Sequence, residues 1–180
     1  MEAGIARRKR RGGLFVGHLA DDNGLGTLLE ALDLFPGARM VVIGAGPEEA
    51  RVRAHPSIDF LGRSARYNAH EHMEHAAYLV LPSLRQEPLP RPLIEAFAHG
   101  LPVIASRLET LADLIEPGRN GLLFEPGSAL DLARRLAWAE AFAERMRQMG
   151  ECAKADYQAR FVADWSYQRL FGERRRIARL

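Results

Sequence analysis

The chain has 180 residues, about the length of one ordinary domain, and 47% of them are hydrophobic, so we expect a single buried core rather than a two-domain enzyme. With 27% charged residues and no apolar run near the roughly 18 residues of a membrane-spanning helix, the sequence fits neither a disordered chain nor an integral membrane protein. A single cysteine, Cys152, excludes an internal disulfide framework, and the N-terminus lacks the apolar stretch of a secretory signal, so we predict a cytoplasmic protein.

The first half of the chain alternates short apolar runs with helical patterns. Residues 14–17 form an apolar run that ends at a glycine, which is typical of a buried strand. Polar residues 21–24 are predicted to cap a helix over 25–35, where apolar residues recur at helical spacing and a Pro-Gly pair follows. The next predicted elements are a strand at 40–44, a short helix from Pro47 and a strand at 58–62.

The second half repeats this alternation and then becomes helical. Three further strands are predicted at 78–81, 102–105 and 121–124. Helices are predicted at 67–77 and 91–99, and from about residue 128 onward. This alternation predicts an α/β domain with a doubly wound, Rossmann-like parallel sheet that helices cover on both faces. Because ligands bind beyond the carboxyl ends of the strands in such sheets, we expect the chemistry there.

Two glutamates near the end of the fourth predicted strand are the most informative candidates. Glu87 lies in the loop after this strand, and Glu95 falls about one turn inside the next helix, whose first turn suits Pro92. Both carboxylates can then face one crevice and accept hydrogen bonds from ligand hydroxyls, as acidic side chains do for ribose in dinucleotide folds. Glu87 could also assist proton transfer or developing charge. The competing interpretation is a solvated loop beside a helix surface.

Short motifs surround this glutamate pair in a fixed order. The first is Phe15-Val16-Gly17, which is followed by Gly24 and residues 27–32. Residues 42–47, 60–63 and 81–83 come next, before the pair Glu87 and Glu95, which has seven residues between its members. The last two motifs are residues 100–106 and 121–124. From Phe15 to about Leu170 the chain resembles the C-terminal, nucleotide-sugar-binding half of GT-B glycosyltransferases of the group 1 type, the retaining family 4. The resemblance implies a single donor-binding domain over residues 12–172 with a helical C-terminal tail.

The resemblance also implies a role for each matched residue. Glu95 would hold the ribose hydroxyls, and Glu87 would lie beside the transferred sugar as the catalytic residue. Backbone groups of Gly62 and Arg63 would line the base pocket, and Leu93 would lie beside the ribose or the phosphate. The remaining predicted donor-binding residues are Gly17, His18, Asn23 and Arg91.

The family transfers a sugar from a nucleoside diphosphate sugar with retention at the anomeric carbon, and it needs no obligatory metal. The donor is a substrate, so no cofactor is expected. Because the resemblance covers one half of such an enzyme, our leading hypothesis is a donor-binding domain of hexosyltransferase type that needs an acceptor domain from another polypeptide. The second hypothesis is a non-catalytic domain of this fold, a gene remnant or a binding module, with a degenerate diphosphate site.

The loop after the first strand departs from the family where the diphosphate should bind. The family usually has an arginine and a lysine where this chain has His18 and Asn23, and the acidic residues 21–22 lie between them. A diphosphate leaving group needs positive charge or backbone donors. We therefore expect a site that is acidic where the family is basic. Arginines that could compensate from new positions are Arg85, Arg91 and Arg107.

A second departure lies between the two glutamates. The family favours phenylalanine and glycine where this chain has Leu89 and Pro90, and Pro92 follows two residues later. Because proline has no N–H, two backbone donors that could face a phosphate at this helix start are lost. A glycine pair that is common in the family is also replaced, here by residues 109–110. Both departures favour the second hypothesis.

The formal net charge of +2 is distributed unevenly along the chain. Residues 1–11 carry +4 and residues 173–180 carry +3, which leaves −5 for residues 12–172. We interpret both ends as basic, solvated tails; a third hypothesis is that they bind an anionic membrane surface or nucleic acid. No interleaved aromatic residues or reading motif support nucleic-acid binding. Apolar residues over 161–177 have the spacing of an amphipathic helix. We expect its apolar face to pack on the domain itself; the alternatives are a homodimer and binding to a partner.

Two other patterns are weaker. Residues 44–49 resemble a dinucleotide-binding fingerprint, but Glu49 replaces its third glycine and the pattern does not open the first strand–helix unit. His70, His72 and His75 suggest a metal cluster, but no second group of ligands accompanies them. We therefore predict a solvated helix over these histidines and no metal site.

Overall fold

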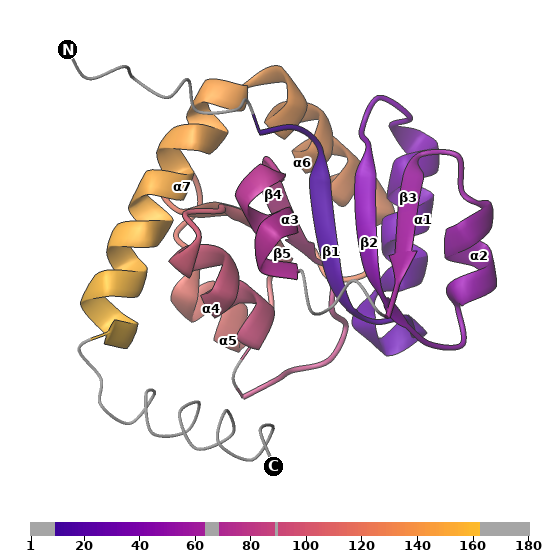
Figure 1. The fold of residues 1–180 in the computed structure, drawn as a ribbon, viewed down its shortest axis with the longest axis horizontal. Helices are drawn as coiled ribbons and strands as arrows, with labels where there is room; N and C mark the ends of the chain where they lie inside the picture. Colours follow the sequence, from indigo (N-terminus) through magenta and orange to yellow (C-terminus); the bar gives the residue numbers. More distant parts are fainter. Residues whose placement is uncertain (1–9, 64–68, 89, 163–180) are drawn as a thin grey trace.

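The computed structural model describes residues 10–63, 69–88 and 90–162 (Figure 1). Its centre is a six-stranded sheet with the strand order β3-β2-β1-β4-β5-β6, in which each neighbouring pair is parallel. The strands are β1 (Gly13–His18), β2 (Met40–Ala45), β3 (Ile58–Gly62), β4 (Tyr78–Leu81), β5 (Val103–Ser106) and β6 (Gly121–Phe124). This confirms the predicted doubly wound, Rossmann-like α/β fold.

The helices lie between the strands and after the last of them. They are α1 (Leu25–Leu34), α2 (Glu49–Ala54), α3 (Ala69–His75), α4 (Arg91–Ala98), α5 (Glu109–Leu114), α6 (Ala129–Ala141) and α7 (Ala143–Tyr157), with a 3-10 turn η1 (Asp21–Asn23) and a π-helical turn η3 (Gln158–Val162). The sequence pattern does not predict α5, and the helical region expected from about residue 128 begins with α6.

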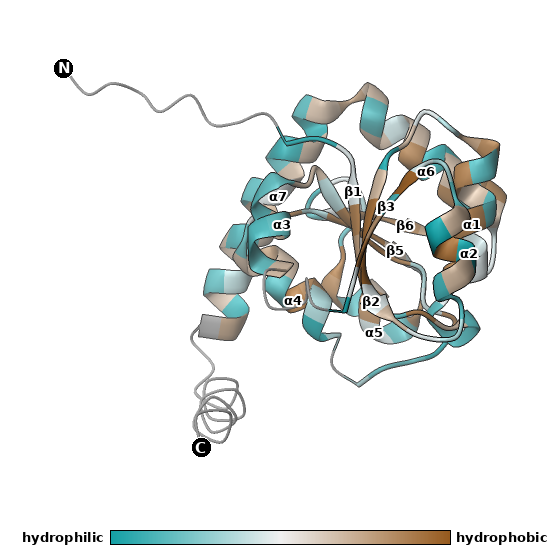
Figure 2. Cartoon of the chain, turned by 45° about the vertical axis from the view of Figure 1, so that its right-hand side comes forward, coloured by the Kyte–Doolittle hydropathy of each residue, from teal (hydrophilic) through white to brown (hydrophobic). Residues whose placement is uncertain are grey.

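The core consists of two apolar clusters on opposite faces of the sheet. Successive strand residues point to opposite faces, so Phe15 belongs to one cluster, and Leu14 and Val16 belong to the other. Helices α1, α2 and α6 contribute to the Phe15 cluster, and α3, α4 and α5 contribute to the Leu14 cluster. Figure 2 shows the hydrophobic strands between these two sets of helices. Strands buried on both faces explain why their sequences are continuous apolar runs.

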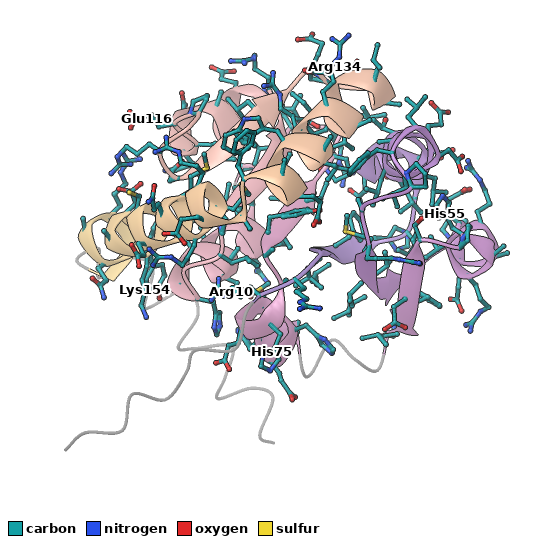
Figure 3. All side chains as sticks on the ribbon, turned by 90° about the horizontal axis from the view of Figure 1, so that it is seen from above. Arg10, His55, His75, Glu116, Arg134 and Lys154 are labelled. Atoms are coloured by element: carbon teal, nitrogen blue, oxygen red, sulfur yellow. The ribbon has the colours of Figure 1, made fainter. Side chains whose placement is uncertain are left out.

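The N-terminal edge of the domain begins before residue 12. The Arg10 guanidinium donates hydrogen bonds to the carbonyl oxygens of Gly100 (2.6 Å) and His99 (2.7 Å), where a cation is favourable because α4 ends there. The Arg11 N–H donates to the carbonyl oxygen of His75 (3.1 Å), and Figure 3 shows Arg10 and His75 on one side of the molecule. The last two residues of the predicted tail are thus held against the domain.

The other expectations for the chain ends lie outside the described residues. These are the charged segments 1–9 and 173–180 and the part of the amphipathic segment beyond residue 162, on which the membrane, nucleic-acid and homodimer hypotheses depend. Within the described residues, no helix has both the length and the apolar character needed to cross a membrane.

A buried polar cluster fastens α7 to the connection between β5 and β6. Asp156 accepts two hydrogen bonds from the Arg119 guanidinium (both 2.6 Å) and one from the Asn120 side-chain amide (2.7 Å). The same amide donates to the carbonyl oxygen of Leu114 (3.1 Å), and its oxygen accepts from the backbone N–H of Glu116 (2.8 Å). Because each hydrogen bond to Asp156 favours the charged form, the Arg119 guanidinium in particular holds the pKa of Asp156 below its ordinary value.

This cluster predicts a pH-dependent contribution to stability. A depressed carboxyl pKa means that the unfolded chain binds more protons in acid, so the contribution is complete above the ordinary aspartate pKa of about 3.9 and is lost as the pH falls through the folded value. We expect Asp156→Asn to lower the free energy of unfolding by about 2 kcal/mol at pH 7. Urea titrations from pH 7 to pH 3 should show this difference shrinking in acid; a pH-independent difference would contradict the assignment.

Candidate functional site

The direction in which successive strands are added to the sheet reverses between β1 and β4. Strands β1 to β3 extend toward one edge, and β4 to β6 extend toward the other. In open α/β sheets, ligands bind in the crevice outside the carboxyl ends of the strands at this switch point. The structure has a cavity of about 1070 Å³ there, lined by the loops after β1, β3 and β4, by the first part of α4, and by α3 and α5.

Seven of the nine predicted site residues line this cavity. They are Gly17, His18, Asn23, Arg63, Glu87, Arg91 and Glu95. Gly62 and Leu93, which are both described, do not line it: Gly62 is the last residue of β3, and the fully buried Leu93 side chain packs in the core beneath α4. The structure therefore brings most of the predicted set together, while the role of each residue stays a prediction.

A backbone hydrogen bond and a close backbone contact join the loops after β1 and β4 beside the cavity. The Leu84 N–H donates to the carbonyl oxygen of Asp22 (3.0 Å), and a Cβ at Gly24 would overlap the carbonyl oxygen of Pro82. Gly24 also has a φ of 72°, in the left-handed region that favours glycine. This arrangement corrects the prediction for residues 21–24: they form a 3-10 turn and an N-cap glycine, with no side-chain capping bond to α1.

Helix α4 places Glu95 at the cavity wall. Pro90 is its N-cap and Pro92 lies in its first turn, so the fixed proline backbone favours a helix start here. Leu93, Ile94 and Phe97 are buried against the sheet, and Glu95, between them in sequence, faces the cavity instead. Glu87 reaches the same cavity from the loop after β4, so the two carboxylates share one crevice. This is the juxtaposition that their spacing predicts.

The start of α4 has few backbone donors to offer an anion. Pro92 has no N–H, and the Leu93 N–H is already donated to the carbonyl oxygen of Pro90 (3.0 Å). A helix start ordinarily binds anions through its first free N–H groups. Positive charge for a phosphate must therefore come from side chains.

Those side chains are arginines, and the expectation of an acidic site is not met. Among the described residues, the cavity lining contains Arg63, Arg85 and Arg91 against the two glutamates. The acidic loop residue Asp22 does not line the cavity; its carboxylate lies 3.3 Å from the Arg85 guanidinium, and Glu87 lies 3.6 Å from it. Two of the three arginines suggested as compensating residues are thus at the site.

A histidine pair lies at one side of the cavity, and one of its two members lines it. His70 of α3 lines it, and its Nδ1 lies 2.9 Å from Nε2 of His99, where α4 ends. Burial is the main cause that lowers the pKa of His99, and the neighbouring His70 and Arg10 lower it further, against Glu74, which raises it. The sequence pattern did not pair these two residues, which are 29 positions apart. No group of three or more potential metal-ligating side chains occurs within the described residues.

The glycines of the weak dinucleotide pattern have a packing role. A Cβ at Gly44 would overlap the carbonyl oxygen of Gly17, and a Cβ at Gly46 would overlap that of Leu19. Both residues are therefore glycine because β2 and the loop after it approach the end of β1 closely. This explains the pattern without a dinucleotide.

Comparisons with known proteins give one family match and several similar relatives and solved structures. Residues 5–156 match the family described as glycosyl transferases group 1. An exopolysaccharide phosphotransferase of Streptomyces coelicolor is 32% identical over 79% of this chain and 16% of its own length. Among solved structures, sucrose-phosphate synthase from Thermosynechococcus elongatus superposes with a TM-score of 0.77 at 26% identity, over 94% of this chain and 45% of its own.

A second solved structure has the same fold with a bound nucleotide. The Anabaena protein HepE, in complex with UDP and glucose, superposes with a TM-score of 0.72 at 23% identity. The match covers 88% of this chain and 45% of HepE. The chain therefore spans less than half the length of each of these three proteins.

Proposed function

The chain belongs to the group 1 glycosyltransferases, and on this premise we propose that it binds a nucleoside diphosphate sugar as the donor-binding domain of a retaining sugar transferase. One observation carries the proposal: a cavity of about 1070 Å³ at the switch point of the sheet combines two carboxylates with three arginines. Carboxylates accept hydrogen bonds from sugar hydroxyls, and arginines bind phosphate oxygens. The UDP complex of the structurally similar HepE supports this class of ligand.

We assign the ligand's parts to the residues that surround the cavity. Glu95 binds the ribose hydroxyls, and Arg63 lies beside the base. Glu87 lies beside the transferred sugar, where a carboxylate stabilises the positive charge that develops at the anomeric carbon as the bond to the diphosphate breaks. His18, the last residue of β1, and Asn23, in the turn that follows, border the cavity. Because arginines supply the positive charge for the leaving group, the proposal includes no metal ion and no cofactor.

Sugar transfer needs a second domain in this proposal. The chain spans 45% of sucrose-phosphate synthase and 45% of HepE. The cavity opens at the carboxyl edge of the sheet and contains groups that suit a donor. We therefore assign the binding of the acceptor to a domain outside this sequence.

The alternative is a non-catalytic member of the fold. Three features favour it: a neutral asparagine at position 23, whose amide donates to the carbonyl oxygen of His18 (2.8 Å), and the two prolines at the start of α4. Each removes a group that could contact a diphosphate. Under this alternative the cavity no longer binds nucleotides with useful affinity.

Calorimetric titration of the full chain with UDP-, GDP- and ADP-sugars separates these two functions. We expect at least one of them to bind with one ligand per chain, and the matching free sugar alone to give no heat, because the nucleotide part provides most of the contacts. If none of the three donors gives heat at millimolar concentration, the donor-binding function is wrong and the non-catalytic alternative holds.

A further inference from the structure

We propose that Arg85 is the diphosphate-binding cation of this site and that Asp22 competes with the ligand for its guanidinium, so that Asp22 limits the affinity for donors. The inference depends on the proposed function for the identity of the ligand. It assigns a role to two residues outside the predicted donor-binding set, and one of them, Asp22, lies outside the cavity lining.

The Arg85 guanidinium lies near two carboxylates. One of its terminal nitrogens lies 3.3 Å from the Asp22 carboxylate and the other lies 3.6 Å from Glu87. Asp22 belongs to the turn after β1, and Glu87 belongs to the loop after β4, so the guanidinium lies between the two loops that lead out of the switch point. The backbone bond from Leu84 to Asp22 (3.0 Å) fixes the separation of these loops. A guanidinium in this position binds anionic ligand groups, above all phosphates, which match its bidentate geometry.

Among the described residues, few other positively charged groups lie at this point of the site. Where the resembled family usually has an arginine and a lysine, this chain has His18, the last residue of β1, and Asn23, whose amide donates to the His18 carbonyl oxygen. The start of α4 contributes neither a Pro92 N–H nor the Leu93 N–H. Arg63 enters from the end of β3, which lies two strand positions from β1. Arg91 lines the cavity from the first turn of α4. Among these described arginines, Arg85 is the one whose guanidinium lies 3.3 Å from a carboxylate in the turn after β1, that of Asp22.

The ion pairs of Arg85 are exposed enough to be exchanged. The side chains are 61% exposed for Arg85, 50% for Asp22 and 41% for Glu87. Exposed pairs of this kind contribute little to stability because water and salt screen them. A diphosphate offers a guanidinium more negative charge and a bidentate geometry. The diphosphate therefore displaces the Asp22 carboxylate from the Arg85 guanidinium. Breaking the ion pair between Arg85 and Asp22 costs energy, and this cost exists only while Asp22 is charged.

This competition makes an unusual prediction for Asp22. Asp22→Asn removes the competing charge and should tighten anion binding about threefold or more, whereas Arg85→Ala should weaken it about tenfold or more. If Asp22 acts through Arg85, the gain from Asp22→Asn should disappear in the Arg85→Ala background. Both side chains are exposed, so we expect the variants to fold as the parent does.

The experiment is a double-mutant cycle on the full chain, with inorganic pyrophosphate, UDP and uridine as probes in calorimetric titrations. Arg85→Ala should weaken binding of pyrophosphate and UDP but leave uridine unchanged, because uridine has no phosphate. The matched control is Arg107→Ala, an exposed arginine after β5 that does not line the cavity, and it should leave all three affinities unchanged. Thermal melts verify that each variant is folded.

Several results would overturn the inference. It is wrong if Arg85→Ala leaves pyrophosphate binding unchanged, if the parent binds no pyrophosphate, or if Asp22→Asn tightens binding equally with and without Arg85. The last result would mean that the charge of Asp22 weakens anion binding directly and not by pairing with Arg85. A parent that binds pyrophosphate but none of UDP, GDP and ADP would contradict the proposed function, and the double-mutant cycle with pyrophosphate would still decide the role of Arg85.

Discussion

Gly24→Ala is expected to lower the free energy of unfolding by about 2–5 kcal/mol and to disrupt the cavity at the same time. A left-handed backbone costs a residue with a Cβ about 1–2 kcal/mol, and Gly24 has a φ of 72°. Its new methyl group would also overlap the carbonyl oxygen of Pro82, and overpacking of this kind adds about 1–3 kcal/mol. Because backbone cannot move aside as a flexible side chain can, the loop after β1 must separate from the loop after β4.

A neighbouring glycine provides the matched control. Gly26 lies two residues later, inside α1, where an added Cβ would meet nothing closer than a carboxylate oxygen of Asp21 at 3.8 Å. Gly26→Ala should therefore be neutral or should stabilise the protein by up to about 1 kcal/mol, because alanine is the better helix former. Urea denaturation measures both variants. Equal stabilities for the two would show that the contact between Gly24 and Pro82 does not hold the loops together.

The strands were predictable because they are buried on both faces. Residues 14–17, 78–81 and 121–124 form continuous apolar runs, and each lies in a strand whose side chains the two core clusters share. Helix α5 was not predictable in this way, because only Leu111 of its six residues is buried and a single buried position has no period. The turn at 21–24 was misjudged because its polar residues suit capping, while the contact with Pro82 decides the backbone.

The sequence predicts the positions of the two carboxylates in the candidate site, but it does not predict the charge of the residues that line the cavity. The positions of Glu87 and Glu95 follow from their placement after a strand and within a helix, so the spacing alone indicates a shared crevice. The pairing of Asp22 with Arg85 depends on how closely two loops approach, which sequence distance does not show. For the same reason, counting acidic residues near His18 predicted a negative site, whereas the structure brings arginines into it from the loops after β3 and β4 and from α4.

Glu95→Ala is expected to weaken binding of a nucleoside diphosphate sugar by about 10- to 100-fold. Hydrogen bonds to a charged group contribute about 1.5–3 kcal/mol, and each 1.4 kcal/mol corresponds to a tenfold change in Kd. In the proposed function Glu95 accepts these bonds from the ribose hydroxyls, and its place on α4 between buried residues keeps the carboxylate aimed at the cavity. Calorimetric titration of the parent and the variant with the same donor measures the loss.

Two further titrations make this result specific to ribose recognition. Pyrophosphate has no ribose, so its affinity should not fall in Glu95→Ala, and removing a negative charge from the cavity can only raise it. Glu30→Ala, an exposed glutamate on α1 away from the cavity, should leave donor binding unchanged. If Glu95→Ala retains full affinity for the donor, or weakens pyrophosphate equally, then Glu95 does not bind the ribose, and the nucleoside part of the ligand must occupy another part of the cavity.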